Sequence, residues 1–320
     1  YDEESPWSDV QVFYSIGAPS APAINAIPSN TARPVVTWSA FSQQVYQLQV
    51  LSGDTIVYDS GIVPGINIRQ HKIKAWLADG EYTVRIRIKN EYDMWSAWGS
   101  AAVTISTEKP EKPTLNLQRS AYGIALHIEN IADYALIYRA NYGTDDYICI
   151  GKTTSSVFHD NAVRNKGEYK YFIRSVSSDE TFEDSDIKFA QAEFQYSLLA
   201  PVLDLSKVFV FTRSLNAPPK RTYSHQLGGA FVEYVGRKHP VWEPTEHISA
   251  GYTMTFFLKN WCEVEDFISL YDRKETVLYR DVRGRKIYGV LGGLTIEDER
   301  NGYTVGFALS EVDYNEELEV

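Results

Sequence analysis

Short runs of alternating apolar and polar residues fill most of this chain, and they limit its possible folds more than any other feature. In GEYTVRIRIKN, apolar side chains take every second position from Tyr82 to Ile88. Turn residues interrupt such runs at intervals of roughly eight to twelve residues, as in antiparallel sandwiches. Because successive side chains of a strand point to opposite faces, this period predicts half-buried β-strands. We therefore expect a mainly β protein.

The alternating pattern occurs in two successive copies, which we predict as domains at 20–110 and 111–198. The tripeptide GEY at 80–82 recurs at 167–169, and each tyrosine follows a glycine at the start of a strand. This place predicts a tyrosine corner, in which the hydroxyl binds upstream backbone. Residues 1–7 match 92–98 at tyrosine, aspartate, serine and tryptophan positions. We therefore predict that 1–19 close a preceding module of a longer polypeptide.

Residues 22–195 contain Trp38 in the second strand and the runs IVYDSG, LADGEY and NEYDMWSAWGS. With these features they resemble the fibronectin type III family. The second copy lacks the tryptophan, and His127 or Ile128 lies near its place. The resemblance implies tandem β-sandwiches. It implies little about function, because such modules serve as spacers and binding surfaces in many proteins.

The segment WSAWGS at 95–100 resembles the WSxWS box of cytokine receptors. Gly99 breaks the pattern, and no paired cysteines accompany it. We therefore expect a structural ladder, in which Arg85 and Arg87 stack on the tryptophan rings by cation–π contact.

A different pattern begins after Pro201 and predicts an α+β domain at 199–320. Apolar residues at helical spacing predict a short helix at Val264–Tyr271, capped by Asn260 with Glu263 closing a capping box. The pair Asn301-Gly302 predicts a β-hairpin. The glycine pairs at 228–229 and 292–293 are interpreted as turns.

The end of this domain, with YRDVRGRKIYGV and VGFALSEVDY, resembles minor tail and tail-tip proteins of long-tailed bacteriophages. The resemblance implies a tail-tube-like β-sandwich with one helix. It also implies a virion structural protein of the distal tail (tail tip or baseplate), assembled in the host cytoplasm. Its partners would then be other tail proteins and copies of itself in a ring, with contact to a host receptor or glycan as a further role.

A second hypothesis belongs to another class. The chain is then a glycan- or receptor-binding protein, secreted or on a cell surface, with the sandwiches as a stalk. This hypothesis would explain exposed Tyr and Trp side chains, of which the chain has 22 and 7 in total. The presence of only 2 Cys favours the first hypothesis, since a disulfide-stapled ectodomain would carry more and a low count is typical of assembly in a reducing compartment.

Composition and motifs exclude several functions. The net charge of −11 argues against a nucleic-acid surface, and no apolar run reaches the roughly 18 residues of a membrane span. No catalytic constellation or phosphate loop occurs, so we expect no enzymatic activity and no cofactor. His225, His239 and His247 lie in the last domain with Cys262, but their spacing matches no zinc site. We expect no metal there.

One cationic spot stands out in the last domain, made of Arg280, Arg283, Arg285 and Lys286. It is either a solvated turn or a subunit-docking contact with an acidic surface. The acidic C-terminal residues 311–319 are a candidate partner, in the same chain or in the next. We expect Arg283 and Arg285 to face an adjacent subunit, so that reversing both to Glu leaves the monomer intact and weakens assembly.

Overall fold

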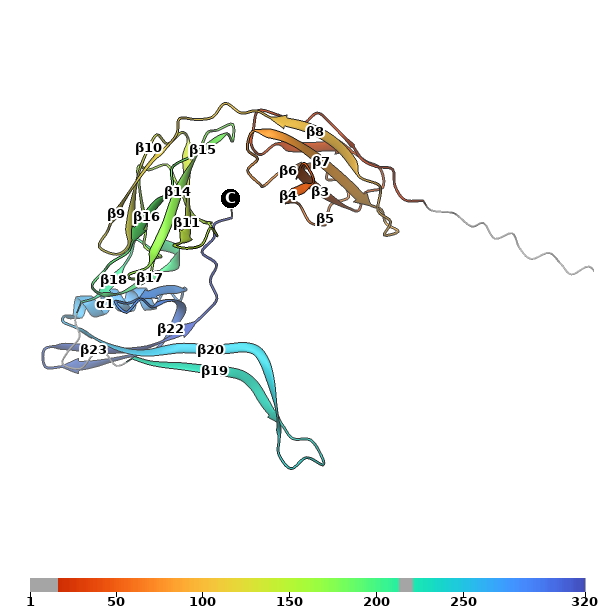
Figure 1. The fold of residues 1–320 in the computed structure, drawn as a ribbon. Helices are drawn as coiled ribbons and strands as arrows, with labels where there is room; N and C mark the ends of the chain where they lie inside the picture. Colours follow the sequence, from red (N-terminus) through yellow and green to blue (C-terminus); the bar gives the residue numbers. More distant parts are fainter. Residues whose placement is uncertain (1–16, 213–220, 320) are drawn as a thin grey trace, which may run out of the picture. The chain divides into compact units, whose positions relative to one another are not determined.

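The computed structural model describes residues 17–212 and 221–319, so most of the segment predicted at 1–19 lies outside the described residues. The described chain forms two compact units. One contains residues 17–110 with 176–183, and the other contains 111–175 with 184–319. Figure 1 colours the strands of both units along the sequence.

The first unit is a β-sandwich of two antiparallel sheets. One sheet has the order β1-β2-β6: Ala23–Ile24, Val35–Ser39 and Gln70–Lys72. The other has the order β4-β3-β7-β8, with β5 also beside β3: Thr55–Asp59, Val45–Ser52, Gly80–Lys89, Gly99–Ile105 and Val63–Pro64. Trp38, Leu48 and Ile86 fill the space between them. The predicted alternation along 82–88 is present, because Val84, Ile86 and Ile88 are buried.

The second sandwich repeats this plan. Its three-stranded sheet has the order β13-β10-β9: Val157–Asp160, Ile124–Glu129 and Thr114–Arg119. The other sheet has the order β12-β11-β14-β15, with β16 also beside β14: Ile148–Thr153, Tyr134–Asn141, Glu168–Val176, Phe182–Asp184 and Lys188–Gln191. Ile128 and Tyr171 belong to the core between the sheets, which therefore forms without a tryptophan.

Both tyrosine corners are confirmed. The Tyr82 hydroxyl donates to the carbonyl of Ala78 at 3.0 Å. The Tyr169 hydroxyl accepts from the backbone N–H of Arg164, also at 3.0 Å. Each hydroxyl binds backbone a few residues upstream and fixes the entry into the following strand.

The C-terminal part forms one seven-stranded sheet with the order β18-β17-β21-β22-β23-β20-β19. These strands are Phe209–Phe211, Ser197–Pro201, Val277–Arg280, Lys286–Glu299, Gly302–Glu311, Val241–Leu258 and Arg221–Val232. A short 3-10 helix, η1 (Val202–Asp204), follows β17. Strand β17 begins at Ser197, so the sheet takes in residues from before the predicted boundary at 199.

The predicted helix is present as α1 (Trp261–Tyr271). The Asn260 side chain accepts from the N–H of Glu263 at 2.9 Å, and the Glu263 carboxylate accepts from the N–H of Lys259 at 2.9 Å. Val264, Phe267 and Leu270 are buried. The Phe267 ring lies 5.1 Å from that of Phe307 on β23. The helix therefore closes the core of the seven-stranded sheet. Among the described residues, no helix is long and apolar enough to span a membrane.

The predicted hairpin joins β22 and β23, with Glu299 opposite Gly302. The two glycine pairs interpreted as turns are bulges inside strands. The register shifts between Leu227 and Gly229, and again between Gly292 and Thr295. Glycine suits both situations, because some bulges and many tight turns place one residue at positive φ, as Gly293 is here at 60°.

Candidate functional site

The cationic spot is not a single surface patch, because Arg280 lies in the interior. Its side chain is fully buried at the end of β21. One guanidinium nitrogen donates to the carbonyls of Tyr122, at 2.5 Å, and Val163, at 3.3 Å. The guanidinium also lies 5.1 Å from the centre of the Phe194 ring. Arg280 therefore fastens the C-terminal sheet to the second sandwich and has no surface for an adjacent subunit.

The turn between β21 and β22 is organised by Asp281, which is fully buried. Its carboxylate accepts from the N–H groups of Arg283 and Arg285 at 2.9 and 3.0 Å. It also forms ion pairs with Arg221, at 2.6 Å, and with the Arg285 side chain, at 2.9 Å. The Arg283 side chain is exposed. A change of Arg285 to Glu would place a second anion beside Asp281, so we expect the double reversal to destabilise the monomer as well.

The fourth cation, Lys286, belongs to a network that joins the second sandwich to the C-terminal residues. Lys286 and Arg139 both form ion pairs with the Glu316 carboxylate. Arg139 also pairs with buried Asp160 at 2.7 Å. Lys286 of the cationic spot therefore contacts the acidic C-terminal residues of the same chain, through Glu316.

The charges of this network shift the pKa values of its members. Burial would raise the pKa of Glu316, but Arg139 and Lys286 outweigh it and hold that pKa below its ordinary value. Burial and the nearby Arg139 cation lower the pKa of Lys286. The network is therefore a carboxylate held between two cations in a poorly hydrated place.

A cavity of about 480 Å³ lies beside this network. Its lining includes Arg139, Arg164, Tyr169, Lys286, Tyr288 and Tyr314. Asp146 and Glu316 line it as well, so it is a polar cavity with tyrosines and charges of both signs on its walls.

A long hairpin of strands β19 and β20 extends beyond the rest of the seven-stranded sheet (Figure 1). Strand β20 pairs with β23 only from Gly251 to Leu258, whereas β19 pairs with β20 along its whole length. We call the outer part of this hairpin, residues 222–250, the arm. Among the described residues, β19 pairs with β20 alone, so the outer edge of the arm is unpaired.

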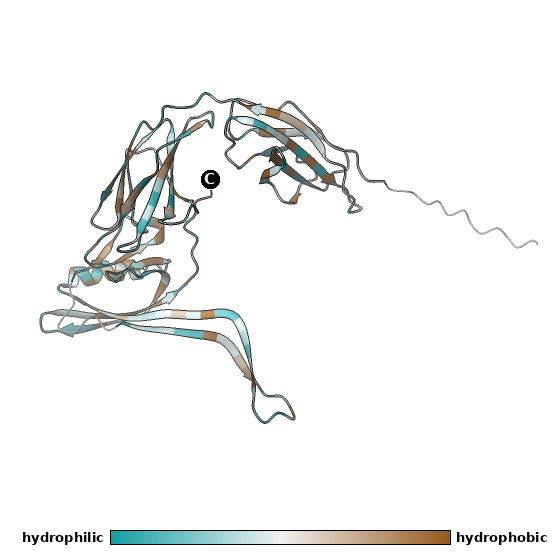
Figure 2. Ribbon diagram, viewed as in Figure 1, coloured by the Kyte–Doolittle hydropathy of each residue, from teal (hydrophilic) through white to brown (hydrophobic). Residues whose placement is uncertain are grey.

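One face of the arm is apolar and exposed. Paired residues of antiparallel strands point to the same face, and the pairs on this face are Tyr223 with Tyr252, His225 with Ala250 and Leu227 with Ile248. Leu227 is 66% exposed and Ile248 is 56% exposed. The opposite face carries polar residues such as Gln226 and Ser249, which also pair. Figure 2 colours apolar residues of both strands brown.

This apolar face continues the core of the sheet. Every second residue of β20 from Leu258 back to Ile248 points to the same side. Met254, Phe256 and Leu258 are buried in the core on that side, whereas Ile248 lies past its end. Among the described residues, the core covers this stripe only as far as Tyr252, which packs against it.

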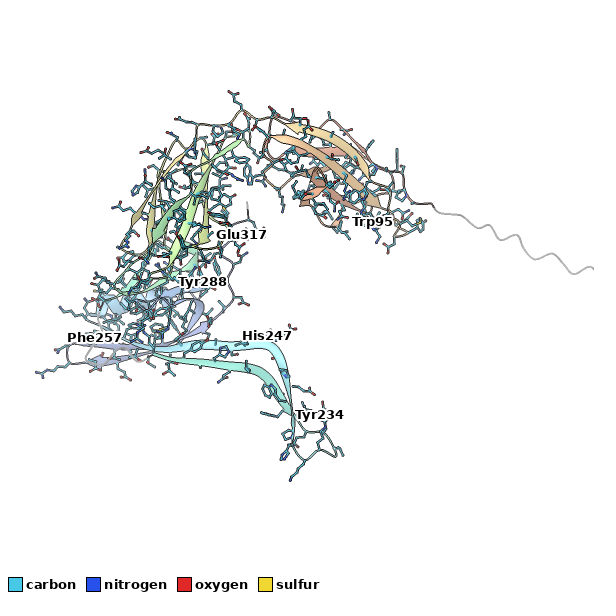
Figure 3. The ribbon with its side chains drawn as sticks, viewed as in Figure 1. Trp95, Tyr234, His247, Phe257, Tyr288 and Glu317 are labelled. Carbon is cyan, nitrogen blue, oxygen red and sulfur yellow. The ribbon has the colours of Figure 1, made fainter. Side chains whose placement is uncertain are left out.

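The tip of the arm adds further exposed rings. Phe231 and Trp242 form a pair with ring centres 4.8 Å apart, and Phe231 is 70% exposed. Tyr234 lies at the tip itself (Figure 3). Such a row of uncovered apolar side chains indicates a surface for another macromolecule.

The predicted cation–π ladder of the first sandwich is confirmed. The Arg85 guanidinium lies 4.6 Å from the Trp98 ring centre, and that of Arg87 lies 4.4 Å from Trp95 and 4.7 Å from Trp98. The Arg87 side chain also donates to Gln47 at 3.0 Å. The box is therefore part of the packing of one sheet.

The histidines and Cys262 of the last domain do not converge. His225 contacts Tyr223 on the arm at 3.2 Å, and Cys262 is exposed on α1. Within residues 17–212 and 221–319, no group of three or more His, Cys, Asp or Glu side chains is placed to hold a metal.

Sequence reasoning missed the residues on which these sites depend. Arg139 and Asp160 are nonlocal partners, and no spacing in the sequence connects them to Glu316. In the sequence, Asp281 is one acid among four cations, and no local pattern marks it as buried. The arm left a usable signal, because Tyr223 and Leu227 alternate with the polar residues Ser224 and Gln226.

No protein-family model and no curated protein sequence matches the chain. Among solved structures, the chain is similar to a two-domain fibronectin type III segment of chicken tenascin, at 11% identity and a TM-score of 0.24, over 55% of this chain and 99% of that one. It is also similar to the FN1–FN3 domains of chicken CNTN1, at 11% identity and a TM-score of 0.24, over 85% and 99% of the two chains.

At these TM-scores the likenesses carry no argument about function. The mainly β architecture with sandwich sheets rests on the strand order itself.

Proposed function

We propose that this chain is a structural protein of the distal tail of a long-tailed bacteriophage, in the tail tip or baseplate. Its C-terminal domain, of tail-tube-like type, makes the contacts of a ring with copies of itself and with other tail proteins. The two sandwiches act as spacers or contact surfaces. The protein assembles in the host cytoplasm and functions in the virion.

The uncovered apolar face of the arm carries this proposal. Burying a Leu or Ile side chain contributes roughly 1.5–3 kcal/mol, so Leu227 and Ile248 favour association with another surface. The face extends the core stripe of β20, so its inner end is fixed by the core of the sheet. An unpaired outer edge on β19 adds backbone groups that can pair with a second strand. Both features suit a subunit that is completed by its neighbours.

The test compares two faces of the same arm. Leu227→Glu with Ile248→Glu puts charge on the apolar face, whereas Gln226→Glu with Ser249→Glu puts the same charge on the polar face. We expect only the first variant to lose self-association in sedimentation velocity, with unchanged circular dichroism. Equal behaviour of the two variants would show that the apolar face makes no subunit contact.

A second measurement addresses the particle. We expect antibodies to this chain to label one end of the tail in electron micrographs of phage particles. Labelling of a cell surface instead, in cells that carry no phage, would favour the glycan- or receptor-binding alternative.

A further inference from the structure

The last described residues of the chain form an extended segment between two sheets. After β23, the N–H of Val312 donates to the carbonyl of Tyr288 on β22 at 3.0 Å. Six residues on, the N–H of Leu318 donates to the carbonyl of Cys149 on β12 at 2.7 Å. Strand β12 is at the edge of its sheet, so it has backbone groups available for an added strand. We call residues 312–318 the tail segment (Figure 3 labels Tyr288 and the neighbouring Glu317).

The tail segment makes its contacts at every second residue, as a strand-like ligand does. The Tyr314 ring stacks on the Tyr288 ring, with centres 4.5 Å apart. The Glu316 carboxylate lies between Arg139 and Lys286. Because contacts fall at 312, 314, 316 and 318, the surface beneath selects an extended peptide with an aromatic residue and a carboxylate two positions apart.

That surface is built without the tail segment. Asp160 holds Arg139 in place and accepts in turn from the Tyr171 hydroxyl at 2.8 Å and the N–H of Ala162 at 2.9 Å. Asp160 balances one of the two cations, so Arg139 and Lys286 together leave one positive charge for a ligand carboxylate. We call the surface formed by Arg139, Lys286, Tyr288 and the edge of β12 the groove.

The tail segment is held by few contacts. Tyr314 and Leu318 keep 45% and 41% of their surface exposed. A cavity of about 220 Å³ remains under the segment, lined in part by Asn161, Val202 and Leu205. Segments with little buried apolar area open locally at low free-energy cost. The groove can therefore exchange its occupant while the sheets on either side stay folded.

We propose that the groove is a docking site for an extended acidic segment, and that in the assembled state it takes the tail segment of a second copy of this chain. The tail segments of any two copies are identical, so exchange keeps every contact of the groove. The segment lies after β23, the last strand of the described chain, and belongs to no sheet itself. This proposal rests on the proposed function only for the supply of a second copy at high local concentration.

The first experiment tests whether the groove binds the segment in trans. The probe is a fluorescein-labelled peptide of residues 311–319, and the chain is full length with Glu316→Arg, which repels the tail segment from Arg139 and Lys286. We expect saturable fluorescence anisotropy, with binding to wild-type chain at least tenfold weaker because its own tail competes. The peptide with Glu316→Gln should also bind at least tenfold more weakly.

The matched control is Glu317→Arg, which makes the same charge change at an exposed neighbour. It should bind the peptide as weakly as the wild-type chain does. If the Glu316→Arg chain binds no better than this control, the groove does not accept the segment in trans and the proposal is wrong.

The second experiment asks whether the occupant comes from a second copy. Mixed heavy- and light-isotope chains are treated at low and at high concentration with a zero-length carbodiimide, which joins an amine to a carboxylate in contact with it, as Lys286 is with Glu316. We expect amide links between 286 and 316 of different chains, increasing with concentration. Links confined to single chains at all concentrations would restrict the groove to its own tail. Neither measurement uses particles or the arm, so failure here leaves the proposed function standing.

Discussion

At the scale of single residues, Asp281 determines the conformation of the turn that contains most of the cations. A buried carboxylate is stable only when its acceptor positions are filled and its charge is balanced. Two N–H groups and two arginine side chains do this for Asp281. The arginines that the sequence suggested for docking therefore include one, Arg285, whose first role is to neutralise this carboxylate.

Asp281→Asn should lower the free energy of unfolding by about 3–5 kcal/mol, because two partly buried cations lose their counter-charge. Urea denaturation at neutral pH measures the change. The control is Asp298→Asn, an exposed aspartate on β22, which should change stability by less than about 0.5 kcal/mol. Equal effects of the two substitutions would contradict the role given to Asp281.

Glu316 should make stability depend on pH. Its pKa in the folded chain lies below the ordinary value of 4.5, so the unfolded state binds the proton more tightly. The stability that Glu316 contributes is present above the ordinary pKa and is lost as the pH falls through the folded pKa. The difference in unfolding free energy between wild type and Glu316→Gln should therefore be largest near neutral pH and shrink below about pH 4. A constant difference across this range would argue against the ion pairs.

At the scale of elements, α1 is held at its start by a side-chain cap. Asn260→Ala should cost about 1 kcal/mol, because the N–H of Glu263 loses its acceptor. Asn260→Asp keeps an acceptor at the same place and should retain most of the stability. Thermal unfolding followed by circular dichroism compares the two. If Asn260→Asp loses as much stability as Asn260→Ala, the side-chain acceptor at position 260 is not what stabilises the helix.

The elements also show what could be predicted from the sequence. Helix α1 was predictable because its cap and its apolar spacing are both local. Strand β17 was not assigned, because all of Ser197–Pro201 is buried and a strand buried on both faces shows no alternation. Bulges at Gly229 and Gly293 have the same glycine signal as turns. The groove depends on pairings across more than a hundred residues, such as Arg139 with Glu316, and no local pattern encodes those.

At the scale of the whole molecule, the two compact units should unfold separately. Trp38 is buried in the core of the first sandwich, so Trp38→Ala should destabilise that unit by roughly 3–5 kcal/mol. The second sandwich and the C-terminal sheet share Arg280 and the Arg139–Glu316 pair, so they should unfold together and at an unchanged temperature. Differential scanning calorimetry should show two transitions, of which only one shifts. A single transition that moves as a whole would rule out independent units.

The continuity of β20 gives the arm a mechanical property. One strand runs from Val241 to Leu258, and its inner half is bonded to β23 from Gly251 onward. A pull along the arm loads all of these backbone hydrogen bonds in shear at once, because they lie perpendicular to the strand. The bonds would have to break together, whereas a peeling force breaks them one at a time. A load applied at the tip is thus carried directly into the sheet that packs against α1.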